Sequence, residues 1–197
     1  YSTSPDDTTN GCKRVVLRGI IGDTSARNGI TLGQRCSDIV VENCHMLNGT
    51  MYAQAFDTEP QGVDQPCRDV HVSDSVFGLW WDTGAPRTQN SSFSIVGGDT
   101  TAAGQENAAR GYRVERNTIY GSLAIASAFD VVIRDNRIIC DFAGNSVAPV
   151  FVNHTSDDVA ILDNYIYDRS ANPAAGAHDA SIMVEVYGIG FLSYQPA

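Results

Sequence analysis

The chain of 197 residues repeats one short pattern several times along its length. The pattern is an Asp, two apolar residues spaced by two, a polar residue, an Asn or small residue, and one more apolar residue. Units that repeat in this way cannot bury their apolar side chains alone and fold by stacking on their neighbours. Clear copies are "CSDIVVENCHM" from Cys36, "CRDVHVSDSVF" from Cys67, "AFDVVIRDNRI" from Ala128 and "SDDVAILDNYI" from Ser156, with weaker copies from Ala109 and Cys12.

Each copy has the periodicity of β-strands, because its apolar positions alternate with other residues. A further strand precedes most copies at a nearly constant distance, as in "GITLG", "LAIAS" and "VFVNH". The small polar position predicts a turn, and Asn suits it by tolerating left-handed backbone angles and bonding locally. This turn position is occupied by Cys44, Ser75, Asn117, Asn136 and Asn164.

Short strands in coils of variable length, without a helical period, indicate an all-β solenoid. Equivalent turn residues would then stack about 4.8 Å apart, and their Asn side chains would form a hydrogen-bonded ladder. Cys36 and Cys67 would also stack, either as free thiols or as a disulfide. The alternative fold is an antiparallel β-sandwich or jelly roll, but the Asn-Gly steps typical of its hairpins fall mostly outside the repeats.

The stacked units "SDIVVENCHMLNG", "RDVHVSDSVFG" and "FDVVIRDNRII" resemble right-handed, single-stranded parallel β-helix proteins of the pectate-lyase-like group, from about Asn28 to Tyr187. The irregular coils resemble bacteriophage tailspike or tail fibre domains most. This resemblance implies a homotrimer, a polysaccharide or surface glycan as partner, and an extracellular or virion location. We therefore expect one β-helix domain over residues 1–197, with a long loop insertion at about 84–108. The start at Tyr1 and the strand-like run near the other end predict a fragment of a longer chain.

The composition argues against two classes of partner. The formal net charge is −10, and only 18% of the residues are charged. Nucleic-acid binding relies on clustered Lys and Arg, so no nucleic-acid partner is expected. No apolar run approaches the roughly 20 residues that span a bilayer, so no membrane insertion is expected. The cysteines and histidines do not fall at zinc-site spacings, so we expect no metal of that kind and no cofactor.

The segment "AQAFDTEP" carries the main catalytic candidates. Asp57 and Glu59 would point to the same face of a strand, about 6.5 to 7 Å apart. Inverting glycosidases separate their two carboxyl groups by about 6.5 to 9.5 Å, so the pair would suit a general acid and a general base. Asp82 is a third catalytic candidate, one coil further along. The alternative is that these acids are only the solvated side of a strand, or that Asp57, Glu59 and Asp64 bind Ca²⁺.

Two adjacent tryptophans give a candidate carbohydrate surface. Trp80 and Trp81 cannot both point inward from a strand, and an exposed aromatic ring stacks well on a sugar. The other interpretation is that one of the two, either Trp80 or Trp81, belongs to the core.

Three functions fit these features, and the fold alone does not choose among them. The first is a tailspike-like protein that binds a bacterial surface glycan and depolymerises it, as a glycoside hydrolase or polysaccharide lyase. The second is a secreted polysaccharide lyase or epimerase, which needs a basic catalyst near the acids, with Lys13, Arg68 and Arg87 as candidates. The third is a non-catalytic binding or structural shaft.

Overall fold

In a computed structural model of the chain, the described residues are 11–23, 28–33, 35–47, 54–59, 66–78, 92–97, 108–140, 148–153, 156–168 and 182–184. All regular structure within these ranges is β-strand, and none of it is helix. No helix that could cross a membrane is found in this part of the chain.

The strands form three six-stranded sheets, and each sheet takes every third strand of the chain. The first sheet contains β1 (Lys13–Arg18), β4 (Ser37–Glu42), β7 (Arg68–Ser73), β10 (Ala109–Glu115), β13 (Ala128–Arg134) and β16 (Asp157–Leu162). The second contains β2 (Ile21–Gly22), β5 (His45–Met46), β8 (Val76–Phe77), β11 (Thr118–Tyr120), β14 (Arg137–Cys140) and β17 (Tyr165–Asp168). The third contains β3 (Ile30–Leu32), β6 (Phe56–Thr58), β9 (Phe93–Val96), β12 (Leu123–Ala126), β15 (Val150–Val152) and β18 (Ile182–Val184).

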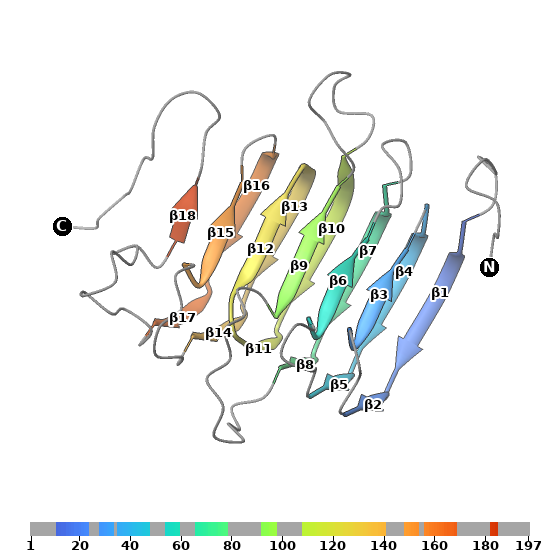
Figure 1. Ribbon diagram of the computed structural model, residues 1–197, viewed down its shortest axis with the longest axis horizontal. Coiled ribbons are helices and arrows are strands. Elements are labelled where there is room, and N and C mark those ends of the chain that lie inside the picture. Colours follow the sequence, from blue (N-terminus) through green and yellow to red (C-terminus); the bar gives the residue numbers. More distant parts are fainter. Residues whose placement is uncertain are drawn as a thin grey trace.

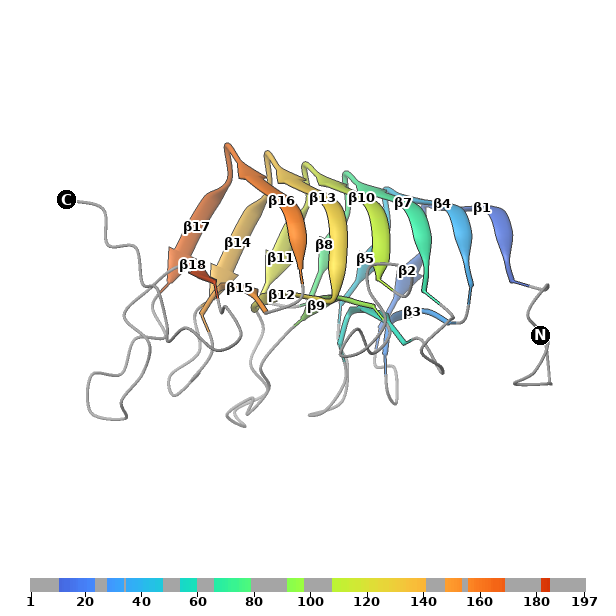
Figure 2. The same cartoon turned by 90° about the horizontal axis from the view of Figure 1, so that it is seen from above.

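Every pair of neighbouring strands is parallel. Figures 1 and 2 show the strands stacked side by side along the long axis, in chain order within each sheet. We call three consecutive strands, one from each sheet, a coil. This arrangement is consistent with a parallel β-helix, and the antiparallel sandwich is excluded for the described strands.

The register confirms the repeat alignment. Ile39, Val70, Tyr112, Val131 and Val159 are successive partners across the first sheet, at the position that follows the repeated Asp. The repeated Asp itself has a left-handed backbone, with φ between 52° and 56° at Asp38, Asp69, Asp130 and Asp158 and 73° at Gly111. Asp and Gly tolerate this conformation better than most residues, so the backbone explains why the repeat selects them.

The turn between the first and second sheets differs in one detail from the expectation. The left-handed residue is the one before the predicted turn position, with φ between 51° and 55° at Asn43, Asp74, Arg116, Asp135 and Asp163. The turn position itself points its side chain into the stack, where burial and hydrogen bonding, rather than backbone freedom, select Asn.

The predicted ladder of side chains is present at this turn. The Asn117 backbone N–H donates to Asn136 Oδ1 at 2.9 Å, and the Asn136 N–H donates to Asn164 Oδ1 at 2.9 Å. Each Asn Nδ2 also donates to a backbone carbonyl of the preceding coil: Asn117 to Val72, and Asn136 to Val114. Ser75 and Cys44 continue the ladder, since Ser75 N–H donates to Asn117 Oδ1 and Cys44 N–H to Ser75 Oγ.

The core lies between the three sheets and is built from the inward-facing residues of each strand. Phe56 stacks on Phe93 with ring centroids 4.3 Å apart, and Phe77 meets both rings edge-on. These aromatic rings join the third sheet to the second. All three rings are fully buried, so they fill the interior of the second and third coils.

The five cysteines are free thiols. Cys36 and Cys67 stack in neighbouring coils, where a hydrogen bond from Cys67 lowers the pKa of Cys36 to about 7. The predicted stacking is thus confirmed, and the two cysteines are free thiols rather than a disulfide.

The segment expected as a loop insertion, 84–108, includes a strand. Residues 93–96 form β9, which pairs with β6 and β12 in the third sheet. The alternation of Phe93 and Ile95, both buried, with Ser94 is a strand signal inside a stretch otherwise rich in Gly, Ser and Thr. The rest of the segment, apart from residues 92, 97 and 108, lies outside the described residues.

Candidate functional site

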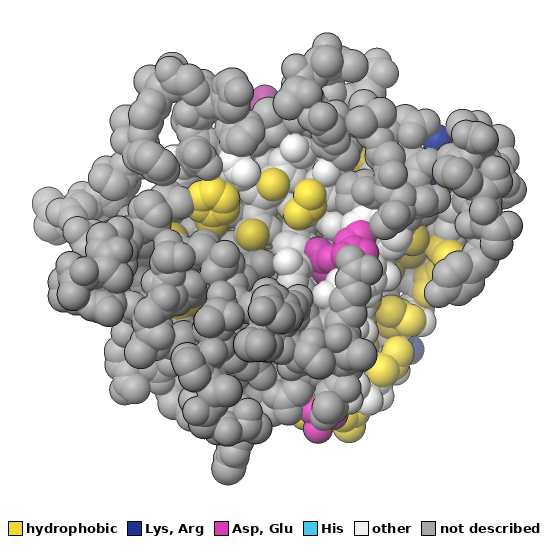
Figure 3. Space-filling model, in the orientation of Figure 1, with side chains coloured by type: hydrophobic (Ala, Val, Ile, Leu, Met, Phe, Trp, Pro, Cys, Tyr) yellow, Lys and Arg dark blue, Asp and Glu magenta, His cyan; other side chains and the backbone are white. Residues whose placement is uncertain are grey.

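Asp57 lies on β6, the second strand from one end of the third sheet, with its side chain on the outer side. Its neighbours Phe56 and Thr58 point inward: Phe56 belongs to the core, and Thr58 Oγ1 donates to the Val96 carbonyl oxygen at 2.9 Å. Alternation along β6 therefore sends the Asp57 side chain outward. Figure 3 shows acidic surface beside patches of apolar surface on the face that carries β6, β9 and β12 in Figure 1.

The Asp57 carboxyl is nevertheless almost removed from solvent, with a relative exposure of 7%. Ser94 Oγ donates to Asp57 Oδ1 at 2.5 Å, and Asn28 Nδ2 donates to Asp57 Oδ2 at 3.1 Å. Asn28 is itself held by Thr31 Oγ1, to which it donates, and by the Gln54 N–H, which donates to Asn28 Oδ1. Ser94 Oγ also contacts Gln54 Oε1. Asp57 thus sits in a polar network drawn from three neighbouring strands and the segments that precede them.

Burial raises the pKa of Asp57 above its usual value, and the negative charge of Glu59 adds to this effect, although the Ser94 hydrogen bond opposes it. Glu59 is also close enough to hydrogen-bond the protonated Asp57 carboxyl. The protonated form of Asp57 is thus favoured by its surroundings.

Beyond Ser94, the outer face of the third sheet continues with small and apolar side chains. Ser94 is in register with Ala124, and Ala124 with Phe151, so the three form one outward row with Asp57. Ala124 and Phe151 are partly exposed. With neighbouring strands about 4.8 Å apart, Phe151 lies about 14 Å from Asp57 along the axis.

The other predicted site residues fall elsewhere. Trp80, Trp81 and Asp82 lie outside the described residues, as do Asp64 and Arg87. Within the described ranges, no three His, Cys, Asp or Glu side chains come together in a way that would hold a metal ion. Lys13 and Arg68 belong to the first sheet, whereas Asp57 belongs to the third.

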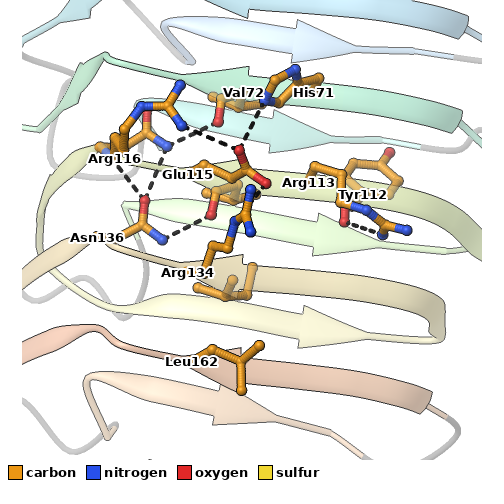
Figure 4. Close-up of polar contacts among 12 residues, drawn as sticks. His71, Val72, Tyr112, Arg113, Glu115, Arg116, Arg134, Asn136 and Leu162 are labelled. Carbon is orange, nitrogen blue, oxygen red and sulfur yellow. Dashed lines mark hydrogen bonds and ion pairs between the residues drawn. The ribbon is translucent and has the colours of Figure 1, made fainter.

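The first sheet carries a second polar cluster, around Glu115 (Figure 4). Arg134 Nε donates to Glu115 Oε1 at 2.9 Å, and Arg116 Nη1 and His71 Nε2 lie 3.3 and 3.5 Å from Glu115 Oε2. Arg116 also pairs in a bidentate manner with Asp74, both distances being 2.8 Å. Burial works against ionisation of Glu115, yet the neighbouring cations hold its pKa below the usual value. Glu115 is therefore a charged anchor between coils and a poor proton donor.

Sequence reasoning missed Asn28 and Ser94, the two side chains that hold Asp57. Neither belongs to the repeated pattern, and Ser94 lies in the segment interpreted as a loop. No family model, no curated protein and no solved structure matches this chain.

Proposed function

We propose that this chain binds a polysaccharide along the outer face of the third sheet and hydrolyses it with Asp57 and Glu59. The proposal includes the finer fold assignment, a right-handed β-helix similar to the pectate-lyase-like and tailspike proteins. The observation that carries it is the buried, raised-pKa carboxyl of Asp57 beside a second carboxyl on an outward face. A buried Asp is easily explained when it lies in the core or in the Asn ladder. Asp57 lies in neither place, because it faces outward from the third sheet.

The chemistry follows from the difference between the two carboxyl groups. A carboxyl with a raised pKa holds its proton more tightly and can donate it to the glycosidic oxygen of a bound sugar. Glu59 would then act at the anomeric carbon, either directly as the nucleophile or by taking a proton from the attacking water. The bond between the anomeric carbon and the leaving oxygen breaks, and the leaving oxygen takes the Asp57 proton.

The row beyond the acids supports an extended ligand. Ala124 is small and partly exposed, and the partly exposed Phe151 offers an aromatic surface for an apolar sugar face. A chain lying along the axis would pass these side chains in turn. The ligand class that fits is therefore a polysaccharide rather than a small metabolite.

The test is an incubation with bacterial capsular, lipopolysaccharide, plant and algal polysaccharides. New reducing ends and the ultraviolet absorbance of unsaturated sugars are followed together. We expect reducing ends without absorbance, with a loss of about 10²-fold or more in rate for both Asp57→Asn and Glu59→Gln. Glu42→Gln, which changes an outward acid of the first sheet, is the matched control and should keep full activity.

Three results would count against this assignment. Absorbance from unsaturated products would mean a lyase, and full activity in both variants would remove Asp57 and Glu59 from the chemistry. Binding of a glycan without any cleavage would leave the third alternative, a binding or structural shaft.

A further inference from the structure

Two buried cysteines occupy equivalent positions in the second and third coils. Cys36 directly precedes β4 and Cys67 directly precedes β7, and the two strands pair in register from Ser37 and Arg68 onwards. The Arg68 N–H donates to the Cys36 carbonyl oxygen at 2.9 Å, so the register extends to the cysteines themselves. Neighbouring parallel strands are about 4.8 Å apart, which places the two Cα atoms within the range of about 4.4 to 6.8 Å that a disulfide spans.

The two thiols differ in their surroundings. Cys67 is 1% exposed, and its Sγ donates to the Gly33 carbonyl oxygen at 2.8 Å. Cys36 keeps 8% exposure, and hydrogen bonds from Cys67 and Cys12 outweigh its burial and lower its pKa to about 7. The thiolate is the reactive form of cysteine, so Cys36 is the nucleophile of the pair and the one that a small molecule in solution reaches first.

Cys44 provides a natural contrast within the same stack. It is fully buried, but its neighbours in register are Ile20 in the preceding coil and Ser75 in the following one. A thiol in this place has no second sulfur beside it with which to form a disulfide. The juxtaposition of Cys36 and Cys67 is therefore a chemical feature that burial of a cysteine does not by itself create.

We propose that Cys36 and Cys67 are a redox pair, which a peroxide converts into a disulfide between the second and third coils. With hydrogen peroxide, the Cys36 thiolate attacks one oxygen and the O–O bond breaks. The departing hydroxide takes a proton from solvent, which leaves water and a sulfenic acid at Cys36. The Cys67 sulfur then attacks the Cys36 sulfur, the S–O bond breaks, and the hydroxyl leaves as water with the Cys67 proton. Two thiols are oxidised, and one peroxide is reduced to two waters.

The first step prepares the second. The pKa of Cys67 is raised chiefly by its hydrogen bond to Cys36, and burial adds to this effect. Because the hydrogen bond is strongest when Cys36 is ionised, conversion of Cys36 to an uncharged sulfenic acid weakens it, and Cys67 becomes easier to ionise. The resolving thiol is thus released only after the first thiol has reacted. The proposal is independent of the chemistry at Asp57.

The test is treatment of the dilute, folded and reduced chain with hydrogen peroxide at neutral pH, followed by blocking of the free thiols and mass spectrometry. Cleavage before Asp residues places each of the five cysteines in a peptide of its own: 7–22, 23–37, 38–56, 64–68 and 135–140. We expect peptides 23–37 and 64–68 to be joined by a disulfide, while Cys44 in peptide 38–56 stays a free thiol.

Two single variants separate the roles of the pair. Cys67→Ser should stop the reaction at the sulfenic acid of Cys36, which dimedone traps, because the new hydroxyl can donate to the Cys36 sulfur but cannot form a disulfide. Cys36→Ser should lower the rate of oxidation at Cys67 at least about tenfold, because it removes the thiolate that reacts first. The matched control, Cys44→Ser, should form the disulfide as the unchanged chain does, and circular dichroism checks that all variants fold.

Three results would overturn the proposal. In the first, Cys36 and Cys67 stay reduced under conditions that oxidise the exposed Cys12. In the second, the disulfide joins Cys12 to Cys36, which would make Cys67 a structural thiol. In the third, Cys67 is oxidised equally fast in folded Cys36→Ser, which would remove Cys36 as the reacting thiol.

Discussion

At the scale of single residues, Asp57 shows how packing changes the chemistry of an ordinary side chain. The sequence places Asp57 and Glu59 on one side of a strand, as for many solvated acids. Asp57 departs from that expectation because it is buried, with its carboxylate oxygens held by Ser94 and Asn28, and its burial raises its pKa. Glu115 is a useful contrast, since it is equally buried but surrounded by cations, and its pKa shifts in the opposite direction.

The raised pKa of Asp57 has a predictable effect on stability. The folded protein holds the Asp57 proton more tightly than the unfolded chain, whose carboxyl has a pKa of 3.8. Stability from this group is therefore full below the unfolded pKa and is lost as the pH rises through the folded pKa. Asp57→Asn removes this loss, so the free energy of unfolding of the variant should gain on that of the unchanged chain as the pH rises from acid to neutral.

Urea unfolding at several pH values measures this difference. A poorer contact between the new amide and Asn28 would change the free energy of unfolding by the same amount at every pH. The loss of the Asp57 proton linkage instead changes it by an amount that varies with pH. Glu42→Gln is the comparison: it leaves Asp57 in place, so it should keep the pH dependence that Asp57→Asn removes. Two stability curves that run parallel with pH would contradict a raised pKa at Asp57.

At the scale of elements, the Asn ladder ties each coil to the next at the turn between the first two sheets. Asn136 accepts from the Asn117 N–H through Oδ1 and donates to the Val114 carbonyl and to Asn164 Oδ1 through Nδ2. All these groups are at the edge of the core, where few other partners can reach them. The ladder thus satisfies backbone groups that the sharp turn removes from the sheets.

Asn136→Ala should lower the free energy of unfolding by about 2–4 kcal/mol, because it leaves buried donors and acceptors unsatisfied. The matched control is Asn164→Ala at the last rung, where the side chain is only partly buried and the cost should be smaller. Denaturant unfolding of both variants gives the two values. Equal costs at both rungs, or a cost below about 1 kcal/mol at Asn136, would count against the ladder as a stabilising element.

At the scale of the whole molecule, burial falls from the middle coils towards both ends. Stability in such a stack is close to a sum over coils and the contacts between neighbours, so the end coils have the fewest stabilising contacts. The amide hydrogens of β1 and β16 should therefore exchange faster than those of β10 and β13. Hydrogen exchange read by mass spectrometry measures this, and uniform protection along the first sheet would contradict it.

Much of the architecture could be predicted from the sequence. Alternation of apolar residues, the repeated Asp and the stacked Asn positions predict strands, turns and their common register, because each depends on local backbone preference or a periodic pattern. Strand β9 was missed because its four residues lie in a polar segment that lacks the repeat. The left-handed turn residue was misplaced by one position for a similar reason, since both neighbours are polar.

The sequence by itself determined that these units stack as parallel strands and that Asp57 and Glu59 share a face. Only the tertiary structure decided that Asp57 is buried and that Ser94 and Asn28 hold it. It also decided that the Glu115 carboxylate is paired with arginines. The reason is physical: periodicity acts between near neighbours in the chain, whereas burial and pKa depend on residues that the stacking of coils brings together.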